Sequence, residues 1–549
     1  MEPGATEKIA EELTWQWGVR SDLSVARLVG LEGANPDGVY GLGASTVLDR
    51  LFCWLGELGV IEDLRGLEGH GVVRESIPFE RWVLLYFVRC LARIESQESL
   101  PELLFTDFAL MTRLGFNAHD LKFGITERGR TARVGPRRNL PLDPEAMSKN
   151  LMKLEVSEVR ATFKAILKRL WAAIPTLPKR LLAAIDGTFI ELGPKAKGAG
   201  VSKRTKQVRT KAGLQSVEVA IFGFKMVWLY VPELGLPLAV AFGTAELDER
   251  AFVRGLLADA REVLDGRATL DTIVLDRGFL DGPGLWEMAA AGLRFVIPAR
   301  RDLNVHAEAI AATRGETPGI ETFAKSRTTT LKKRVEGQKK LVPVQRTLEV
   351  VGVEGLRTME TYAPEDQVGE KGHKERYKKD FEANRINAVV LTREDGRDDP
   401  DFVLLTNGPV RQPLATFDDY DERSRIENQG HRELKQRWAL ECPVQRSAKA
   451  AEIHVYFVVL AFALTQAFRQ WHDDQIDLDE ETGDSTLGRY HRRLAIQNAD
   501  KIIVFLGHEY GIFYTSEYSL LLGRPVKHPN PRAAHSLDEL FERLEAPRG

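Results

Sequence analysis

The sequence predicts a mixed α/β core that follows a helical N-terminal domain and is interrupted by a β-rich insertion. Three observations predict this organisation. In residues 1–150, apolar side chains recur at spacings near 3.6, as they do in amphipathic helices. From residue 181 onward, short β-rich segments alternate with amphipathic helices. A second group of β-rich segments, separated by basic loops, occupies residues 301–400.

The first 150 residues are expected to form a separate helical domain. The helical spacing is clearest in STVLDRLFCWLGELGV (45–60) and FERWVLLYFVRCLARI (79–94). A basic segment punctuated by glycine and proline, residues 128–144, ends in NLPLDP, which suits a helix start after a linker. We therefore place the first domain boundary near residue 150.

Residues 151–300 are predicted to form the first part of the core, with the element order βββαβαβ. This is the order of a ribonuclease-H-like fold, in which three antiparallel strands come first and later strands return through helices. Many other α/β proteins share the order, so it does not decide the fold alone. The expected elements span residues 181–192, 217–231, 236–245, 248–266, 272–279, 285–292 and 294–300.

After residue 300 the sequence predicts no immediate helix but an insertion, residues 301–400. Its β-rich segments lie at 328–335, 341–353 and 358–363. This insertion would separate the first part of the core from the second.

The second part of the core, residues 401–475, is expected to contain a strand, the helix 419–438 and the apolar helix 453–468. The apolar helix is shorter than the roughly 20 residues of a membrane span, so we expect a buried core helix and no membrane partner. For the C-terminal region, residues 476–549, dimerisation is one hypothesis.

Cysteine content and charge exclude several classes of protein. Only Cys53, Cys90 and Cys442 occur, and no two form a C-x-x-C pair. This argues against a disulfide framework or a cysteine zinc site and favours a cytoplasmic location. The net charge of −3 excludes a uniformly basic protein. Three segments are nevertheless strongly basic (195–211, 325–340 and 371–379), and each is either a solvated loop or a nucleic-acid contact.

Two aspartates stand where a charge is unexpected. Asp186 interrupts the apolar strand AAIDGTFI, where a charge is costly to bury unless it is paired or metal-bound. Asp276 ends the strand TIVLD, at the edge where open α/β sheets bind ligands. Alternatives are an Asp-Gly turn for Asp186, and an ion pair with Arg277 or a helix cap for Asp276.

A third carboxylate, Glu427, lies on the helix 419–438. At 100° per residue, one face of this helix carries a tyrosine, two cations, a histidine and this glutamate. A solvated, salt-bridged helix face is the alternative interpretation. The residues of this face are Tyr420, Arg423, Glu427, His431 and Lys435.

These motifs together resemble the bacterial and archaeal DDE insertion-sequence transposases, whose acidic helix carries the signature Y-x2-R-x3-E-x6-K. Tyr420, Arg423 and Glu427 match that spacing, whereas Lys435 falls one residue late. The resemblance extends to the contexts IDGT of Asp186 and LDRGF of Asp276, and it spans about residues 180–470.

The resemblance implies a nucleoid-associated enzyme that cuts and pastes double-stranded DNA, working as a homodimer with a hairpin intermediate. Asp186, Asp276 and Glu427 would hold two Mg²⁺ or Mn²⁺ ions. A metal-activated water would cut the element end, and the freed 3′-hydroxyl would attack the opposite strand or the target. The helical N-terminal domain would recognise the element ends. DNA phosphates would be contacted by Tyr420, Arg423, Lys435, Lys203, Arg204, Lys206, Arg209 and Lys211.

Three other functions stay open at this point. A host-adapted DNA-binding protein would keep the fold without the chemistry, and a ribonuclease-H-like nuclease would cut DNA without joining it. A zinc hydrolase using Glu427 and His431 is disfavoured, because the sequence has no H-E-x-x-H motif and no third ligand nearby.

Overall fold

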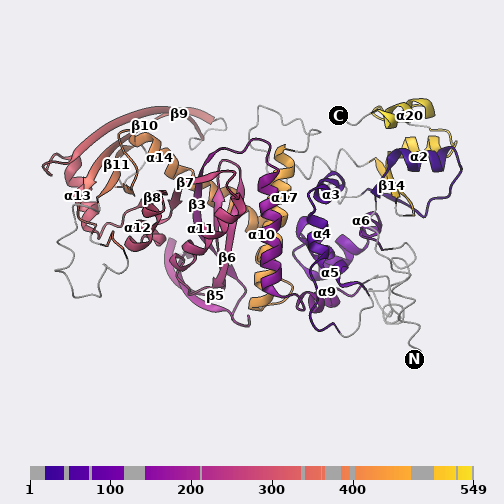
Figure 1. Cartoon of the computed structure of the whole chain (residues 1–549), viewed down its shortest axis with the longest axis horizontal. Helices are drawn as coiled ribbons and strands as arrows, with labels where there is room; N and C mark the ends of the chain where they lie inside the picture. Colours follow the sequence, from indigo (N-terminus) through magenta and orange to yellow (C-terminus); the bar gives the residue numbers. More distant parts are fainter. Residues whose placement is uncertain are drawn as a thin grey trace. The chain divides into compact units, whose positions relative to one another are not determined.

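The computed structural model describes residues 19–42, 48–72, 77–116, 142–210, 213–334, 341–359, 361–364, 385–395, 402–471, 500–507, 509–526 and 530–546. Two compact units are present (Figure 1). One unit is continuous, Trp171–Glu433. The other combines Met1–Leu170 with Leu434–Gly549. The chain is thus a mixed α/β protein with large sheets.

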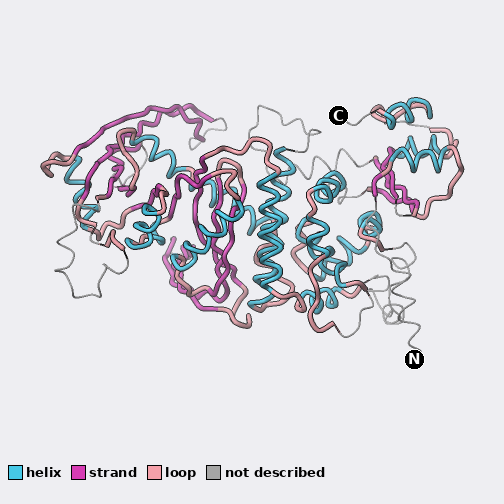
Figure 2. Tube along the Cα trace, viewed as in Figure 1, coloured by secondary structure: helices cyan, strands magenta, loops and turns pink. Residues whose placement is uncertain are grey.

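One large mixed sheet organises the continuous unit (Figure 2). Its strand order is β4-β5-β3-β7-β8-β12-β11-β10-β9, and β6 pairs with β5 off this path. Consecutive residues of the central strands β7 and β8 are buried, as expected where both faces of a sheet are covered.

The elements predicted for residues 181–300 are all present and follow one another as predicted, but an additional strand, β4, lies between the first two. β3 pairs antiparallel with β5 and parallel with β7, and β7 pairs parallel with β8. The bounds are β3 Arg180–Glu191, β4 Gly200–Thr210, β5 Gly213–Val231, β6 Leu236–Thr244, α11 Arg250–Leu264, β7 Thr269–Leu275, α12 Gly282–Ala290 and β8 Arg294–Pro298.

The region after residue 300 differs from the prediction in two places. A helix, α13 (Asn304–Thr313), follows directly where none was expected. Four of its ten residues are alanine, which favours a helix even without a clear apolar stripe. The segment 358–363, expected to be β-rich, lies in no strand among its described residues.

The β-rich segments of residues 301–400 extend the same sheet instead of forming one of their own. β9 and β10 make a long hairpin, β10 pairs with β11, and β12 joins β11 to β8. The bounds are β9 Glu321–Arg334, β10 Leu341–Leu356, β11 Ile386–Glu394 and β12 Phe402–Thr406.

The predicted helix 419–438 is a helical run that starts earlier and changes type along its length. Pro413 opens it, at the first helical position, where its missing N–H costs nothing. The middle of the run is a π-helical turn. The segments are α14 Pro413–Asp421, α15 Arg423–Arg425, the π-helical turn η7 Ile426–His431 and α16 Arg432–Arg437.

In the discontinuous unit, helices from both ends of the chain share a core. The apolar helix is longer than predicted, Ala448–Trp471 (α17). By length and composition it could cross a membrane, but 89% of its most apolar window is buried inside the protein. The expectation of a buried core helix is confirmed. The helices around it include α3 Leu48–Glu57, α4 Val60–Arg65, α5 Phe79–Leu91, α6 Phe108–Arg113, α9 Pro144–Leu151 and α10 Val156–Ala172.

A four-stranded sheet in this unit joins the two ends of the chain. Its order is β1-β14-β13-β2, so strands from the N-terminal part flank a C-terminal hairpin. Buried apolar side chains of α2 pack with those of β13, β14 and the last helices. The bounds are β1 Val19–Arg20, α2 Asp22–Gly30, β2 Gly38–Gly41, β13 Lys501–Leu506, β14 Glu509–Tyr514, α19 Thr515–Leu521 and α20 Leu537–Glu545.

Candidate active site

Asp186 lies in the middle of β3, next to the point where its parallel pairing with β7 stops, and Asp276 directly follows β7. The register of β3 and β7 pairs Ile185 with Leu275, so each aspartate is the next residue along its strand. Neighbouring strands are roughly 4.8 Å apart. The fold therefore brings the two carboxylates together at the edge of the sheet where α/β proteins bind ligands.

Of the structural alternatives, the structure has the helix cap of Asp276, whereas Gly187 continues β3 and makes no turn after Asp186. The backbone N–H of Gly187 donates to Oδ1 of Asp186 at 2.9 Å. The backbone N–H of Arg277 donates to Oδ1 of Asp276 at 2.6 Å, where Asp276 caps a short helix. Each of these bonds uses one oxygen of the carboxylate, so a structural role does not exclude a second one.

Arg423 connects the third carboxylate to the first. Its Nη1 lies 3.5 Å from Oδ2 of Asp186, and its Nη2 lies 3.0 Å from Oε1 of Glu427. The arginine side chain is only 15% exposed, whereas that of Glu427 is 56% exposed. A largely buried cation thus joins an acid of the sheet to an acid of the helical run.

The electrostatics of Asp186 tie all three acids into one cluster. Burial raises the pKa of Asp186 to about 7, and the Arg423 guanidinium opposes that rise. The charges of Asp276 and Glu427 raise the pKa further. Because burial disfavours the charged form of this carboxylate, a nearby cation stabilises it more than it would stabilise an exposed carboxylate.

Tyr420 lies next to this cluster on the same helical run. Its ring contacts Phe402 at 5.6 Å between centroids, and the guanidinium of Arg423 lies 5.8 Å from its centre. Burial raises the pKa of Tyr420, so its hydroxyl stays protonated at neutral pH. The hydroxyl is therefore a hydrogen-bond donor.

Lys435 lies beyond the π-helical turn, in the discontinuous unit. Its Nζ forms an ion pair with Glu441 at 3.0 Å, and the lysine side chain is 25% exposed. Glu427 is the second residue of the turn η7, which ends at His431, four residues before Lys435.

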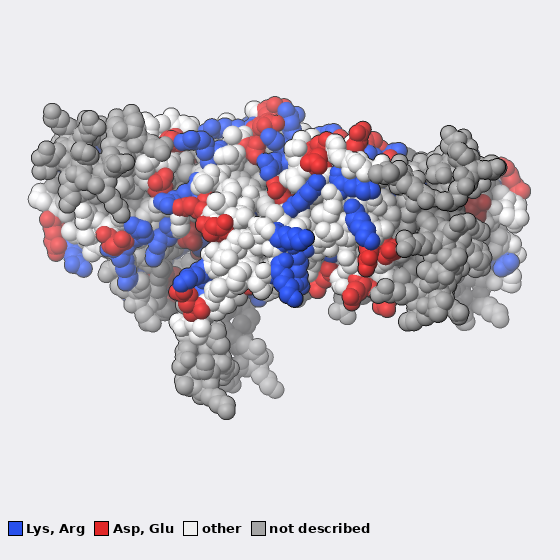
Figure 3. All heavy atoms as spheres, turned by 90° about the horizontal axis from the view of Figure 1, so that it is seen from below, with Lys and Arg blue, Asp and Glu red and all other residues white. Residues whose placement is uncertain are grey.

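The basic residues expected to contact DNA are only partly described. Lys203 and Arg204 are exposed on β4, which was not predicted as a strand, and Lys203 pairs with Glu218 at 2.8 Å. Lys206 and Arg209 belong to the same strand, but their side chains lie outside the described part, as does Lys211 altogether. On the face shown in Figure 3, basic side chains are interspersed with acidic ones.

The sequence did not reveal the aromatic support of the site. Trp228 lies directly opposite Asp186 across the β3–β5 pair and is fully buried. The ring of His431 stacks on Trp228 with centroids 5.3 Å apart, and its Nδ1 lies 3.7 Å from Oδ2 of Asp186. The only available signal was the position of His431 on the same helix face as Glu427.

The donor set of the cluster suits a hard divalent cation. Mg²⁺ prefers carboxylate oxygens and needs few of them, because it keeps several waters. Such an ion would stabilise the charged form of the buried Asp186. The exposed side chain of Glu427 leaves room for it to bind the same ion. As placed here, no group of three or more His, Cys, Asp or Glu side chains among the described residues makes up a metal site. The guanidinium of Arg423 stands between two of the acids instead.

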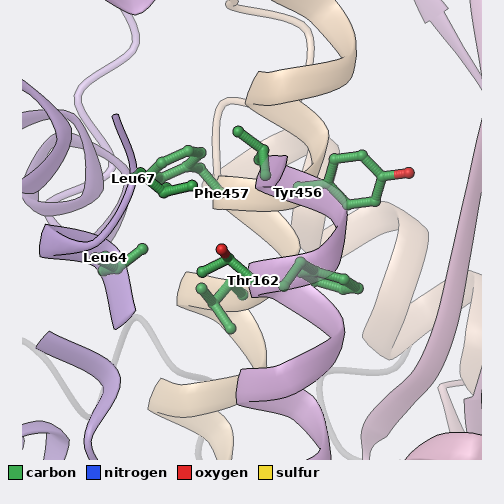
Figure 4. Close-up of a pocket in the computed structure, with 8 residues that line it drawn as sticks. Leu64, Leu67, Thr162, Tyr456 and Phe457 are labelled. Atoms are coloured by element: carbon green, nitrogen blue, oxygen red, sulfur yellow. The ribbon is translucent and has the colours of Figure 1, made fainter. Parts of the chain in front are cut away.

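An apolar hollow in the discontinuous unit offers no alternative site (Figure 4). It holds no acid and no candidate residue, and only Thr162 and Tyr456 add hydroxyl groups. Its lining consists of Leu64, Leu67, Val159, Thr162, Phe163, Tyr456, Phe457 and Leu460.

Comparison with known protein families finds a match over the region that contains all three acids. Residues 177–464, just over half of the chain, match the family described as "Transposase DDE domain". No curated protein matches the sequence. Among solved structures, the chain aligns with the cryo-EM structure of a piggyBac transposase synaptic complex with hairpin DNA. The identity is 10%, the coverage is 87% of this chain and 80% of that one, and the TM-score is 0.32.

Proposed function

The chain belongs to the transposase DDE domain family, and from this membership we propose that it is a DNA transposase that cuts and joins phosphodiester bonds at the ends of an insertion sequence. The observation that carries the proposal is the strand register that brings Asp186 and Asp276 together, with Arg423 connecting Glu427 to them. Carboxylates from separate elements that converge in this way suit phosphoryl transfer.

We assign two Mg²⁺ or Mn²⁺ ions to Asp186, Asp276 and Glu427. When bound, the ions would neutralise phosphate charge and lower the pKa of water. The three acids come from the middle of β3, from the residue after β7 and from a helical turn, and these differ in stiffness. The two aspartates are fixed by the sheet, whereas Glu427 is free to adjust because its side chain is exposed.

Arg423 has the chemistry for two successive roles. It first holds Asp186 and Glu427 together, because its guanidinium reaches both. Its planar donors match the paired oxygens of a phosphate equally well, so we assign it to the DNA backbone beside the cut. The protonated hydroxyl of Tyr420, next to it, would donate to the same backbone.

The π-helical turn supports a DNA contact for Lys435 as well. In such a turn the hydrogen bonds run from residue i to i+5, so one more residue is fitted into the helix. One residue is also the amount by which Lys435 departs from the signature spacing. We infer that the turn accounts for the extra residue in the signature spacing, so that Lys435 takes the place of the signature lysine.

The wider organisation is proposed on the same basis. The core would be ribonuclease-H-like, with residues 301–400 as its β-rich insertion. The N-terminal domain, residues 1–150, would recognise the element ends, and residues 476–549 would take part in dimerisation. The protein would act on double-stranded DNA as a homodimer in the nucleoid of a bacterial or archaeal cell. Lys203, Arg204, Lys206, Arg209 and Lys211 would contact phosphates.

A strand-transfer experiment tests the proposal. Inverted repeats around the coding region would supply the DNA, as an oligonucleotide duplex that ends in the cleaved 3′-hydroxyl. Incubated with a supercoiled plasmid and Mn²⁺, the full-length protein should join this end covalently to the plasmid. Asp186→Asn should abolish joining and leave DNA binding intact.

The same experiment separates the two alternatives. A nuclease of the same fold would cut an uncleaved repeat with Mn²⁺ but transfer no end. A host-adapted DNA-binding protein would bind the repeat and neither cut nor join it. Either result would overturn the assignment as a transposase.

A further inference from the structure

The π-helical turn that carries Glu427 rests on an aromatic platform inside the sheet. Trp228 and Tyr230, two residues apart on β5, stack with ring centroids 4.9 Å apart at 30°. Both side chains are buried, at 0% and 1% exposure. Rings packed so densely cannot shift to accommodate a change in their neighbours.

His431 continues this stack toward the candidate site. Its ring lies 5.3 Å from that of Trp228 at an angle of 22°, and it is only 8% exposed. Stacked rings stabilise a contact beyond the area that they bury. His431 is also the last residue of the turn η7, so the stack attaches the end of this turn to β5.

The same imidazole faces Asp186. Trp228 and Asp186 are cross-strand partners, and their side chains lie next to each other on one face of the sheet. His431 covers both, with its Nδ1 3.7 Å from Oδ2 of Asp186. One ring therefore contacts the platform and an acid of the candidate site together.

Gly430 permits this approach. A Cβ at position 430 would lie 2.4 Å from Cζ2 of Trp228, far inside contact distance. The indole is fully buried, so the backbone of the turn would have to move away instead. Any larger residue at this position would lift the turn off the platform.

We propose that Gly430 and His431 act as positioning residues, which hold the turn carrying Glu427 against the strand carrying Asp186 through the Trp228 platform. The proposal rests on the assignment of these acids to a shared divalent-metal site. π-Helical turns are rare and occur often at functional sites. Here the stack stabilises a turn that would otherwise relax to an ordinary helix.

Two measurements on the full-length protein test this positioning role. Hydrogen exchange followed by mass spectrometry reports the protection of residues 426–433. Mn²⁺ titration followed by electron paramagnetic resonance reports metal binding without DNA or catalysis. We expect His431→Ala and Gly430→Ala to speed exchange in this segment and to weaken Mn²⁺ binding about 10- to 100-fold, as changes beside metal ligands do.

His431→Phe tests whether the stacked ring, and not the imidazole nitrogens, holds the turn in place. It keeps a ring on Trp228, so protection of residues 426–433 should return to the wild-type level. The matched control is His306→Ala, because His306 is also 8% exposed and lies in α13 of the same unit. It should leave both measurements unchanged.

The outcomes distinguish this inference from the proposed function. The inference fails if His431→Ala keeps wild-type exchange and Mn²⁺ affinity, if His306→Ala changes them equally, or if His431→Phe protects the turn no better than His431→Ala. The metal assignment itself fails if the wild-type protein and Asp186→Asn bind Mn²⁺ equally, whatever the exchange shows.

Discussion

Replacing Asp186 by asparagine should make the protein more stable while removing its activity. Burial raises the pKa of Asp186 from 3.8 to about 7 in the folded chain. Below about pH 4 the carboxyl is protonated in both folded and unfolded states, so the shift has no effect on stability there. As the pH rises toward 7, only the unfolded chain ionises, and the folded state loses stability relative to it.

The size of the effect follows from that shift. At about 1.4 kcal/mol per pKa unit, the cost is about 4 kcal/mol at pH 8 and about 2 kcal/mol at pH 5. The pKa of about 7 already includes the attraction of Arg423. Asparagine removes the cost and keeps an oxygen for the Gly187 N–H, but its NH2 group then faces the guanidinium of Arg423 and cannot accept a hydrogen bond from it. With about 1–2 kcal/mol deducted for these opposed donors, the net gain is about 2–3 kcal/mol at pH 8 and close to zero at pH 5.

Thermal unfolding in EDTA measures this difference. For a unit of this size, the gain at pH 8 corresponds to a rise in Tm of about 5–10 °C. Asp302→Asn is the control, because the Asp302 side chain is 70% exposed and lies in the same unit. The reasoning is refuted if Asp186→Asn is no more stable than the wild type at pH 8, or gains equally at pH 5.

Three further predictions follow from the same contacts. Asp276→Asn and Glu427→Gln should each reduce Mn²⁺-dependent nicking of element-end DNA at least about 100-fold, with unchanged binding in a gel-shift assay. Lys435→Ala should lower the salt dependence of DNA binding by about one phosphate contact, whereas Lys449→Ala, at another partly exposed ion pair of the same unit, should not. Arg294→Met should lower the free energy of unfolding by about 1–3 kcal/mol in urea, because Arg294 on β8 donates hydrogen bonds to Asp419 and Thr416 of α14. An unchanged urea midpoint would contradict this.

The sequence predicted the elements that carry the acids because each has a strong local signal. The strand before Asp276 ends in three apolar residues, Ile273 to Leu275, and the strand around Asp186 has four consecutive buried residues before Gly187. Element order then implied that these strands are neighbours. Their register was not predictable, since it depends on packing across the whole sheet.

Other features had no local signal. The strand β4 is hidden by its basic residues, which indicate a loop, and it forms only because it pairs with β5 along its whole length. The platform under His431 arises from residues about 200 positions apart, so nothing near Trp228 or His431 indicates it. The π-helical turn had no recognised signal either; on the proposed interpretation, the displacement of Lys435 by one residue would have indicated it.

The most direct test of the central claim is the covalent transfer of a pre-cleaved element end to plasmid DNA. The account predicts that the wild-type protein joins the 3′-hydroxyl end in the presence of Mg²⁺ or Mn²⁺, and that Asp186→Asn, Asp276→Asn and Glu427→Gln bind the same DNA without joining it. Joining that persists in any of these three variants, or its absence from a wild-type protein that binds the end and the metal, would contradict the account.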